Sequence, residues 1–378
     1  MRFRIIFLIF IILTVSSSSG ISQNLPKDSV FGNVKKIREK VIFLTKQENP
    51  QIIYESDYGH MGFQGPDKTI SIFNNYWYST QLCYYINYER FFNKKGHIIK
   101  DIWYGKKDVF FYSSRYIYDK NDRLSIVIDS VKINPSEFYP EITKHYYDER
   151  DDNLHESIIH LEFNNFSMFD KYYVKGKKTR SEQHDKDGVI FDTIFKYNDN
   201  GKLDNYIFKR RAGRSTETNS LIYKIRKRIY EYDKKNRPIG IYTSGPLSDN
   251  GISTENNTKN TEFKYQGDNL ITKIRYGSSG SMYFSNYKYD KGNRLIKEYC
   301  CDKNISKATT IIEYTYNKNR VEKLIFSEED YDVNHNKFLK KHNVSYKYKY
   351  DSNNNWIEII KTVDGVDLYK WIREIEYY

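Results

Sequence analysis

The chain is poor in several residue types that define familiar protein classes, with 7 Pro, 4 Met and 3 Cys among 378 residues. Three cysteines, Cys83, Cys300 and Cys301, are too few for a disulfide framework. On a strand the adjacent Cys300 and Cys301 would face opposite ways. Either one of them pairs with Cys83 or all three are free and buried, and we favour the second arrangement.

Long apolar runs are also missing. The run from Ile5 to Val15 is shorter than the roughly 20 residues that a membrane-spanning helix needs. It follows Arg2 and Arg4 and precedes small polar residues, a pattern typical of a cleaved signal peptide over residues 1–22. An uncleaved anchor is the alternative. We expect a mature chain that begins at Gln23, has no transmembrane segment and is exported to the periplasm, the cell surface or the extracellular space.

Aromatic residues are abundant, with 37 Tyr and 22 Phe. Together with Ile, Val and Thr they suit a pleated, half-buried surface, so the composition favours β structure. The net charge is +12, or +10 without Arg2 and Arg4, and it is spread along the chain. Such an excess is typical of a solvated face and also favours anionic polymers. We expect no nucleic-acid partner, because an exported protein rarely meets one.

A short motif recurs along the chain, mostly every 24 to 37 residues. Its close copies are FNKKGHI from Phe92, YDKNDRL from Tyr118, HDKDGVI from His184, YNDNGKL from Tyr197, YDKKNRP from Tyr232, YDKGNRL from Tyr289 and YDSNNNW from Tyr350. Looser copies start at Tyr147, Tyr265, Tyr316 and Tyr331. The His184 and Tyr197 copies are only 13 residues apart.

Each copy reads as strand, tight turn and strand. Aromatic residues alternate before the turn, as at Tyr287 and Tyr289, which places them on one face of a strand. The first turn residue, Asp or Asn, favours a type I turn, and the fourth sits where a three-residue hairpin loop needs a positive φ. All seven fourth residues are of types that tolerate this conformation: Gly96, Asp122, Gly188, Gly201, Asn236, Asn293 and Asn354.

Hairpins in series predict an all-β fold, an extended and twisted antiparallel meander that can curl into an open shell. A compact sandwich is the alternative. We divide the chain into a signal peptide (1–22), an N-terminal β region with a Gly-rich loop (23–85) and the hairpin repeats (86–378). The segment from Val34 to Val41 fits a strand better than a helix, and Ser244 to Asn260 is predicted to be a long loop.

The motif resembles the Tyr-Asp repeats of bacterial RHS and YD-repeat proteins, most closely in YDKGNRLIKEY from Tyr289 and YEYDKKNRPIGIY from Tyr230. The resemblance covers about residues 86 to 378. Large members of that group wind their repeats into a β-shell around a C-terminal toxin. This chain ends on repeat sequence, and we expect its repeats to be too few to close such a shell, so the resemblance implies a short exported member without a toxin domain.

We expect no catalytic residue, no metal site and no cofactor. The zinc-protease-like stretch from His155 to His160 is one residue too long, and its two His residues would face opposite ways on a strand. His184 occupies an aromatic position of a repeat and is expected to pack there. Most motif carboxylates are explained as turn residues. A glycosidase pair formed in space stays open as a minor alternative.

The function we expect is that of a non-catalytic exported envelope or cell-surface protein, a scaffold or a binding surface. If the aromatic stripes form the core, the opposite face is broad and basic, which suits an acidic envelope polysaccharide or another surface protein. The residues assigned to this binding face are Lys264, Lys273, Arg275, Lys288, Lys297, Lys347 and Lys349. The alternatives are a component related to an RHS-type toxin or secretion system and, less favoured, a glycan hydrolase. The oligomeric state stays open.

Overall fold

The computed structural model of the chain describes residues 30–45, 77–134, 137–150, 153–162, 165–214, 221–247, 257–277, 280–302, 308–318 and 320–378. These residues form 22 strands and one short 3-10 turn, η3 (Lys106–Asp108). The strands are β1 (Val34–Phe43), β2 (Asn87–Phe92), β3 (Ile98–Tyr104), β4 (Phe110–Tyr118), β5 (Leu124–Asn134), β6 (Glu137–Arg150), β7 (Asn153–Glu162), β8 (Asn165–Val174), β9 (Lys177–Asp185), β10 (Gly188–Tyr197), β11 (Leu203–Arg214), β12 (Leu221–Tyr232), β13 (Pro238–Leu247), β14 (Thr258–Gln266), β15 (Asn269–Tyr276), β16 (Met282–Tyr289), β17 (Leu295–Asp302), β18 (Ala308–Asn317), β19 (Arg320–Tyr331), β20 (Lys337–Tyr350), β21 (Trp356–Val363) and β22 (Val366–Tyr377).

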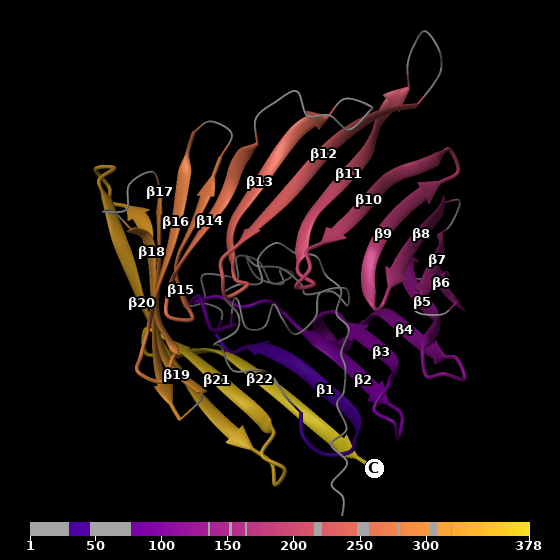
Figure 1. Cartoon of the computed structure of the whole chain (residues 1–378). Helices are drawn as coiled ribbons and strands as arrows, with labels where there is room; N and C mark the ends of the chain where they lie inside the picture. Colours follow the sequence, from indigo (N-terminus) through magenta and orange to yellow (C-terminus); the bar gives the residue numbers. More distant parts are fainter. Residues whose placement is uncertain are drawn as a thin grey trace, which may run out of the picture.

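The strands form a single closed sheet. Each strand pairs antiparallel with the next along the chain, and β22 pairs antiparallel with β1 from Val34–Tyr377 to Phe43–Tyr369. Figure 1 shows the strands in chain order around a ring, with yellow β22 beside indigo β1. The predicted antiparallel meander is confirmed, and so is the strand at Val34 to Val41.

The predictions of an open shell and of a sandwich are wrong, because the ring is closed by β1. This strand precedes the repeats and lacks their motif, yet it supplies the neighbour that both β2 and β22 require. The expectation that the chain is too short to close a shell fails for the same reason. Closure pairs every strand on both sides and leaves no free sheet edge.

The repeat turns adopt the conformation that their sequence demands. All seven fourth residues have a positive φ, for example 59° at Asn293, 74° at Gly201 and 108° at Gly188. In the Asp290 turn the amide of Asp290 donates to Arg294 O and the amide of Asn293 donates to Asp290 O. The same two bonds close the turns that begin at Asn93, Asp119, Asn198, Asp233 and Asp351.

Two copies of the motif differ from the others in their position on the barrel. Antiparallel order places the turns after β2, β4, β10, β12, β16 and β20 at one rim of the barrel. The His184 copy instead joins β9 to β10, and the Tyr331 copy joins β19 to β20, so both lie at the opposite rim. The 13-residue spacing of the His184 and Tyr197 copies is therefore the length of one strand, β10, between the two rims.

The motif tyrosine connects neighbouring hairpins. Its hydroxyl donates to the backbone carbonyl that begins the returning strand of the preceding hairpin, as from Tyr316 to Leu295 O at 2.7 Å. The same bond joins Tyr118 to Ile98, Tyr147 to Leu124, Tyr197 to Lys178, Tyr232 to Leu203 and Tyr289 to Leu270. In the last copy it is made to Val321 by Tyr348, two residues before the motif tyrosine Tyr350. This hydrogen bond between successive repeats needs a hydroxyl, so tyrosine is favoured over phenylalanine at the motif position.

We expect Tyr316→Phe to lower the free energy of unfolding by about 1 kcal/mol, the typical net value of one internal hydrogen bond. Tyr146→Phe is the matched control, because that side chain is 51% exposed on β6. Urea titration of both variants measures the difference. Equal stability of the two variants would show that the hydroxyl contact contributes nothing.

The main core lies on the inner side of the ring. Residues 77–86, drawn in purple before β2, run inside the ring (Figure 1), and Trp77 is 1% exposed. Trp77 packs edge-on against Trp371, with ring centroids 5.2 Å apart, and its carbonyl accepts from Tyr346. Tyr287, Tyr314 and Tyr346 belong to the same buried cluster. The prediction that the aromatic stripes form the core is thus confirmed for these residues.

Cys83, Cys300 and Cys301 are thiols and not disulfides, as we favoured, but only Cys83 and Cys301 are buried and Cys300 is half-buried. Cys83 is buried in the core segment, Cys300 lies 3.7 Å from Ser285 Oγ, and Cys301 packs with Ile274 and Phe284 in a separate cluster. Cys300 and Cys301 therefore occupy opposite faces of β17, as expected for adjacent strand residues.

Other predictions fall partly or wholly outside the described residues. These are the signal peptide (1–22), Gln23 and the Gly-rich loop of the N-terminal region (23–85), which lies between residues 58 and 68. In the predicted loop from Ser244 to Asn260, residues 244–247 belong to β13 and residues 258–260 to β14. The loop is therefore shorter than predicted. The domain boundary at residue 86 stays a prediction.

Candidate functional site: a basic patch on the inner wall

The predicted binding face is divided between the two sides of the wall. Lys264, Lys288, Lys297, Lys347 and Lys349 alternate with the inward aromatic stripes and lie on the outer face. Lys273 pairs directly with Phe263, and Arg275 with Thr261, so these two residues lie on the inner face. The seven residues do not form one surface.

The outer lysines also have acidic neighbours. Lys349 Nζ lies 2.7 Å from Glu358 Oε1, and Lys370 Nζ lies 2.8 Å from the other oxygen of the same carboxylate. These two hydrogen bonds lower the pKa of Glu358. Further outer pairs are Lys297–Glu313 at 2.8 Å, Lys347–Asp367 at 3.3 Å and Lys264–Glu262 at 3.5 Å. At these lysines the outer face is therefore a surface of mixed charge.

A denser group of cations lies on the inner wall, on β11 and β12. We call Arg210, Lys224, Arg226 and Arg228 the lumenal basic patch. The strand register places Arg210 opposite Lys224, Phe208 opposite Arg226 and Tyr206 opposite Arg228. Arg228 and Tyr230 are two residues apart on β12, so the patch continues the inward stripe of Tyr230 and Tyr232.

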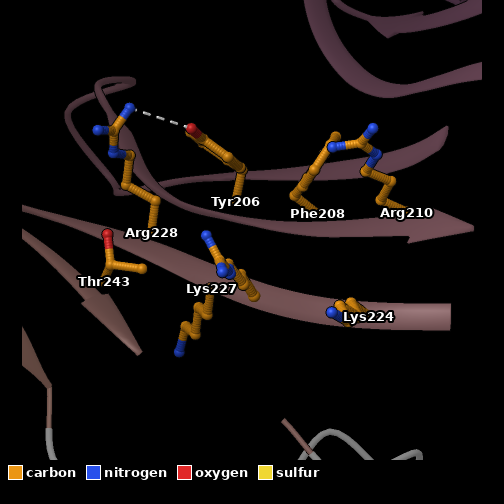
Figure 2. Close-up of a pocket in the computed structure, with 8 residues that line it drawn as sticks. Tyr206, Phe208, Arg210, Lys224, Lys227, Arg228 and Thr243 are labelled. Atoms are coloured by element: carbon orange, nitrogen blue, oxygen red, sulfur yellow. Dashed lines mark hydrogen bonds between the residues drawn. The ribbon is translucent and has the colours of Figure 1, made fainter. Parts of the chain in front are cut away.

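These side chains line a pocket of about 470 Å³, together with Lys227 and Thr243. Figure 2 shows Tyr206, Phe208 and Arg210 along one strand and Lys224 and Arg228 on its neighbour. Arg228 Nη1 donates to the Tyr206 hydroxyl at 3.3 Å. Phe208 stacks on Phe191 with ring centroids 5.5 Å apart and an interplanar angle of 21°. The pocket thus combines flat aromatic faces with cationic groups.

No carboxylate of the described residues lies within ion-pair distance of the four patch cations. Arg210 instead lies over the Phe191 ring, 5.5 Å from its centroid. The adjacent Arg211, which faces outward, pairs with Asp185. Like charges held close together repel, and a bound anion would relieve that repulsion. The chemistry that this arrangement supports is therefore binding of a negatively charged group.

Several other charges on the inner wall have a partner of opposite sign. Arg90 makes two bonds of 2.8 Å with Asp101, and Lys171 lies 3.1 Å from Glu156. Burial raises the pKa of Glu298 to about 7, although the nearby Lys273 opposes the shift. A raised pKa suits a general acid, but one such carboxyl is not the pair that glycoside hydrolysis requires.

Several His residues of the described part of the chain lie in pairs with carboxylates rather than in a cluster that could hold a metal ion. His155 and His160 lie on β7, so they alternate between its two faces as expected. His155 Nε2 lies 2.9 Å from Asp170 Oδ1, and His184 Nε2 lies 3.6 Å from the other oxygen of Asp170. His184 alternates with Gln183, which pairs with Phe191, and so faces outward. Among the residues with assigned positions, no group of three or more His, Cys, Asp or Glu side chains could hold a metal ion.

No protein-family model and no curated protein matches this chain. Among solved structures, the chain is similar to the Photorhabdus luminescens Tc holotoxin pore (mutation TccC3-D651A), with 12% identity and a TM-score of 0.27. That match covers 75% of this chain and 19% of the other, so the chain spans about a fifth of that relative. It is also similar to a porin-like protein from Bacteroides uniformis, with 9% identity, a TM-score of 0.29 and coverage of 92% and 99%. Likeness at this level assigns neither a family nor a function.

No helix in the described segments is long and apolar enough to cross a membrane.

Proposed function

We propose that the protein is an exported, non-catalytic binding protein whose barrel holds an acidic polysaccharide on its inner wall. The observation that carries this proposal is the lumenal basic patch, four cationic side chains on one face without a carboxylate partner among the described residues. The N-terminal signal pattern supports export. Carbohydrate remains the proposed ligand class because it is the charged polymer that an exported bacterial protein most often meets.

The aromatic side chains support a ligand with flat, weakly polar faces. Tyr206 lies between Phe195 and Tyr230, with ring centroids at 5.9 and 6.3 Å. Sugar rings stack on such surfaces through their apolar faces, while guanidinium groups bind carboxylates through paired hydrogen bonds. Both features lie on the same inner wall, within the reach of one ligand.

Ion pairs on the outer wall support an outer surface in water. Lys36 Nζ lies 2.9 Å from Glu89 on neighbouring strands, and the Glu358 carboxylate joins Lys349 to Lys370 across three strands. A lipid-facing wall would need an apolar outward band in these positions. These pairs support the proposal that the protein binds its ligand in the periplasm, on the cell surface or outside the cell.

The test is to compare binding of an oligogalacturonate by two double variants. We expect Arg226→Ala/Arg228→Ala to weaken binding at least tenfold, because each charged hydrogen bond contributes about 1.5–3 kcal/mol. Lys347→Ala/Lys349→Ala removes two outward charges and should leave affinity within about twofold. Titration calorimetry at two salt concentrations should show weaker binding at higher salt.

Equal loss in both double variants would mean that net charge, and not the patch, determines binding. Absence of binding to any acidic glycan at low salt would refute the proposal. Binding with the same affinity at both salt concentrations would refute the charge-based mechanism.

A component related to an RHS-type toxin or secretion system is the second candidate. The YD-like motif supports it, as does the presence of residues 77–86 inside the ring (Figure 1), because a shell of that kind encloses polypeptide. Copurification with an exported toxin from the native host, resistant to high salt, would favour this alternative.

A further inference from the structure

We propose that the anionic ligand is a linear chain that enters the barrel by a free end and lies along β12. This inference rests on the proposed function, since it specifies how the lumenal basic patch is reached and which ligand shape it takes. It follows from the position of the patch in a closed wall and from the order of its side chains along one strand.

Access to the patch is restricted by the closed sheet. All 22 strands are paired on both sides, and β11 pairs with β10 and with β12 along most of its length. Arg226 and Arg228 share the inward face with Tyr230, so their charges do not reach the outer surface through the wall. A ligand therefore reaches them only through an opening of the barrel.

The cations are graded in depth. Arg210 and Lys224 lie nearest the rim where β11 ends and β12 begins, and Arg226 and Arg228 follow farther in. Alternate residues of a strand are about 6.8 Å apart, so Lys224 to Arg228 spans about 14 Å. The aromatic side chains of Tyr230 and Tyr232 then continue the same line towards the opposite rim.

This order fits an extended polyanion better than a compact ion. A single carboxylate can contact one or two members of the row, whereas a chain with charges over about 14 Å can contact all three cations of β12. Affinity should therefore rise with ligand length until the charges span the row and then level off. A ligand bound on the flat outer face would instead continue to gain affinity with length through repeated sites.

The experiment uses the full-length protein and oligogalacturonates of defined length in three forms: unmodified, coupled at one end to a folded protein, and coupled at both ends. We expect the unmodified and single-coupled forms to bind within about threefold of each other. Blocking both ends should weaken binding at least tenfold, because neither end can then pass through the opening. Lys347→Ala/Lys349→Ala should reproduce this pattern, and Arg226→Ala/Arg228→Ala should weaken every form that binds.

If the doubly coupled form binds as tightly as the unmodified one and Arg226→Ala/Arg228→Ala still weakens its binding, end-first access is wrong and the proposed function stands. Undiminished binding that is insensitive to that variant would overturn both. If the unmodified ligand does not bind at any length, the proposed function itself fails. Stronger binding of single-stranded DNA of equal charge would replace carbohydrate as the ligand class.

Discussion

Replacing Arg373 with methionine is expected to lower the free energy of unfolding by about 3–5 kcal/mol, the cost of leaving a buried charge without its partner. Arg373 on β22 and Glu39 on β1 are both almost fully buried. Arg373 Nε and Nη2 each lie 2.7 Å from Glu39 Oε1, and Trp371 Nε1 donates to Glu39 Oε2 at 3.0 Å. The pair spans the seam between the last and first strands, so its loss weakens closure of the barrel.

Urea unfolding monitored by tryptophan fluorescence measures this loss. Lys370→Met is the matched control, because Lys370 lies on the same strand in a partly exposed pair with Glu358, where pairs contribute at most about 1 kcal/mol. The double variant Glu39→Gln/Arg373→Met removes both charges and should recover part of the stability. If Arg373→Met proves no more harmful than the control, the buried pair does not hold the seam.

The hairpins were predictable because their requirements are local. A residue with positive φ must be one of a few types, and the motif supplies Gly, Asn or Asp at that position in every close copy. Asn293 and Gly201 show the result directly, since both have the required backbone and the same pair of turn hydrogen bonds. The motif is not, however, specific to one rim, as the His184 copy shows.

Closure could not be predicted from the motif. It depends on pairing between residues more than 300 positions apart, such as Glu39 with Arg373, and β1 carries no trace of the repeat. The alternation of charged and apolar residues in β1 would fit a strand at the edge of an open sheet as well as a strand between β2 and β22. Only the buried pair of Glu39 and Arg373 identifies β22 as the neighbour of β1, and this pair can be recognised only when both strands are in place.

The candidate site was missed although the sequence contains a signal for it. In KIRKRIYEY from Lys224, the inward positions of Tyr230 and Tyr232 extend backwards at period two to Arg228, Arg226 and Lys224. Extending the period-two positions of each aromatic stripe to the basic residues that precede it would have placed cations on the inner wall. The prediction instead assigned seven basic residues to the face opposite the stripe, which holds for Lys347 and fails for Lys273.

The stability of the barrel is expected to rise with pH between pH 7 and pH 9 through one buried amine. Lys361 on β21 is almost fully buried, and its Nζ donates to Leu82 O at 2.7 Å and to Trp77 O at 3.0 Å. Burial lowers the pKa of Lys361 to about 7, with the Cys83 thiol as a smaller opposing influence. In the unfolded chain the pKa of a lysine is about 10.4.

The sign follows from proton binding. Above pH 7 the unfolded chain holds a proton on Lys361 that the folded barrel has released, so raising the pH favours the folded state by at most about 1.4 kcal/mol per pH unit. Lowering the pH towards 7 removes this contribution. The difference in unfolding free energy between the wild type and Lys361→Met should therefore increase by about 1–3 kcal/mol from pH 7 to pH 9.

Taking the difference between the two proteins cancels titration of cysteines and other lysines, which both contain. Lys347→Met provides the control, because Lys347 lies in an exposed pair with Asp367 on the outer face, and the difference from the wild type should not change with pH. A constant difference across this range would show that Lys361 stays protonated in the folded barrel. The ammonium would then hold residues 77–82 against β21 as a permanent charge, and the inner segment would be anchored independently of pH.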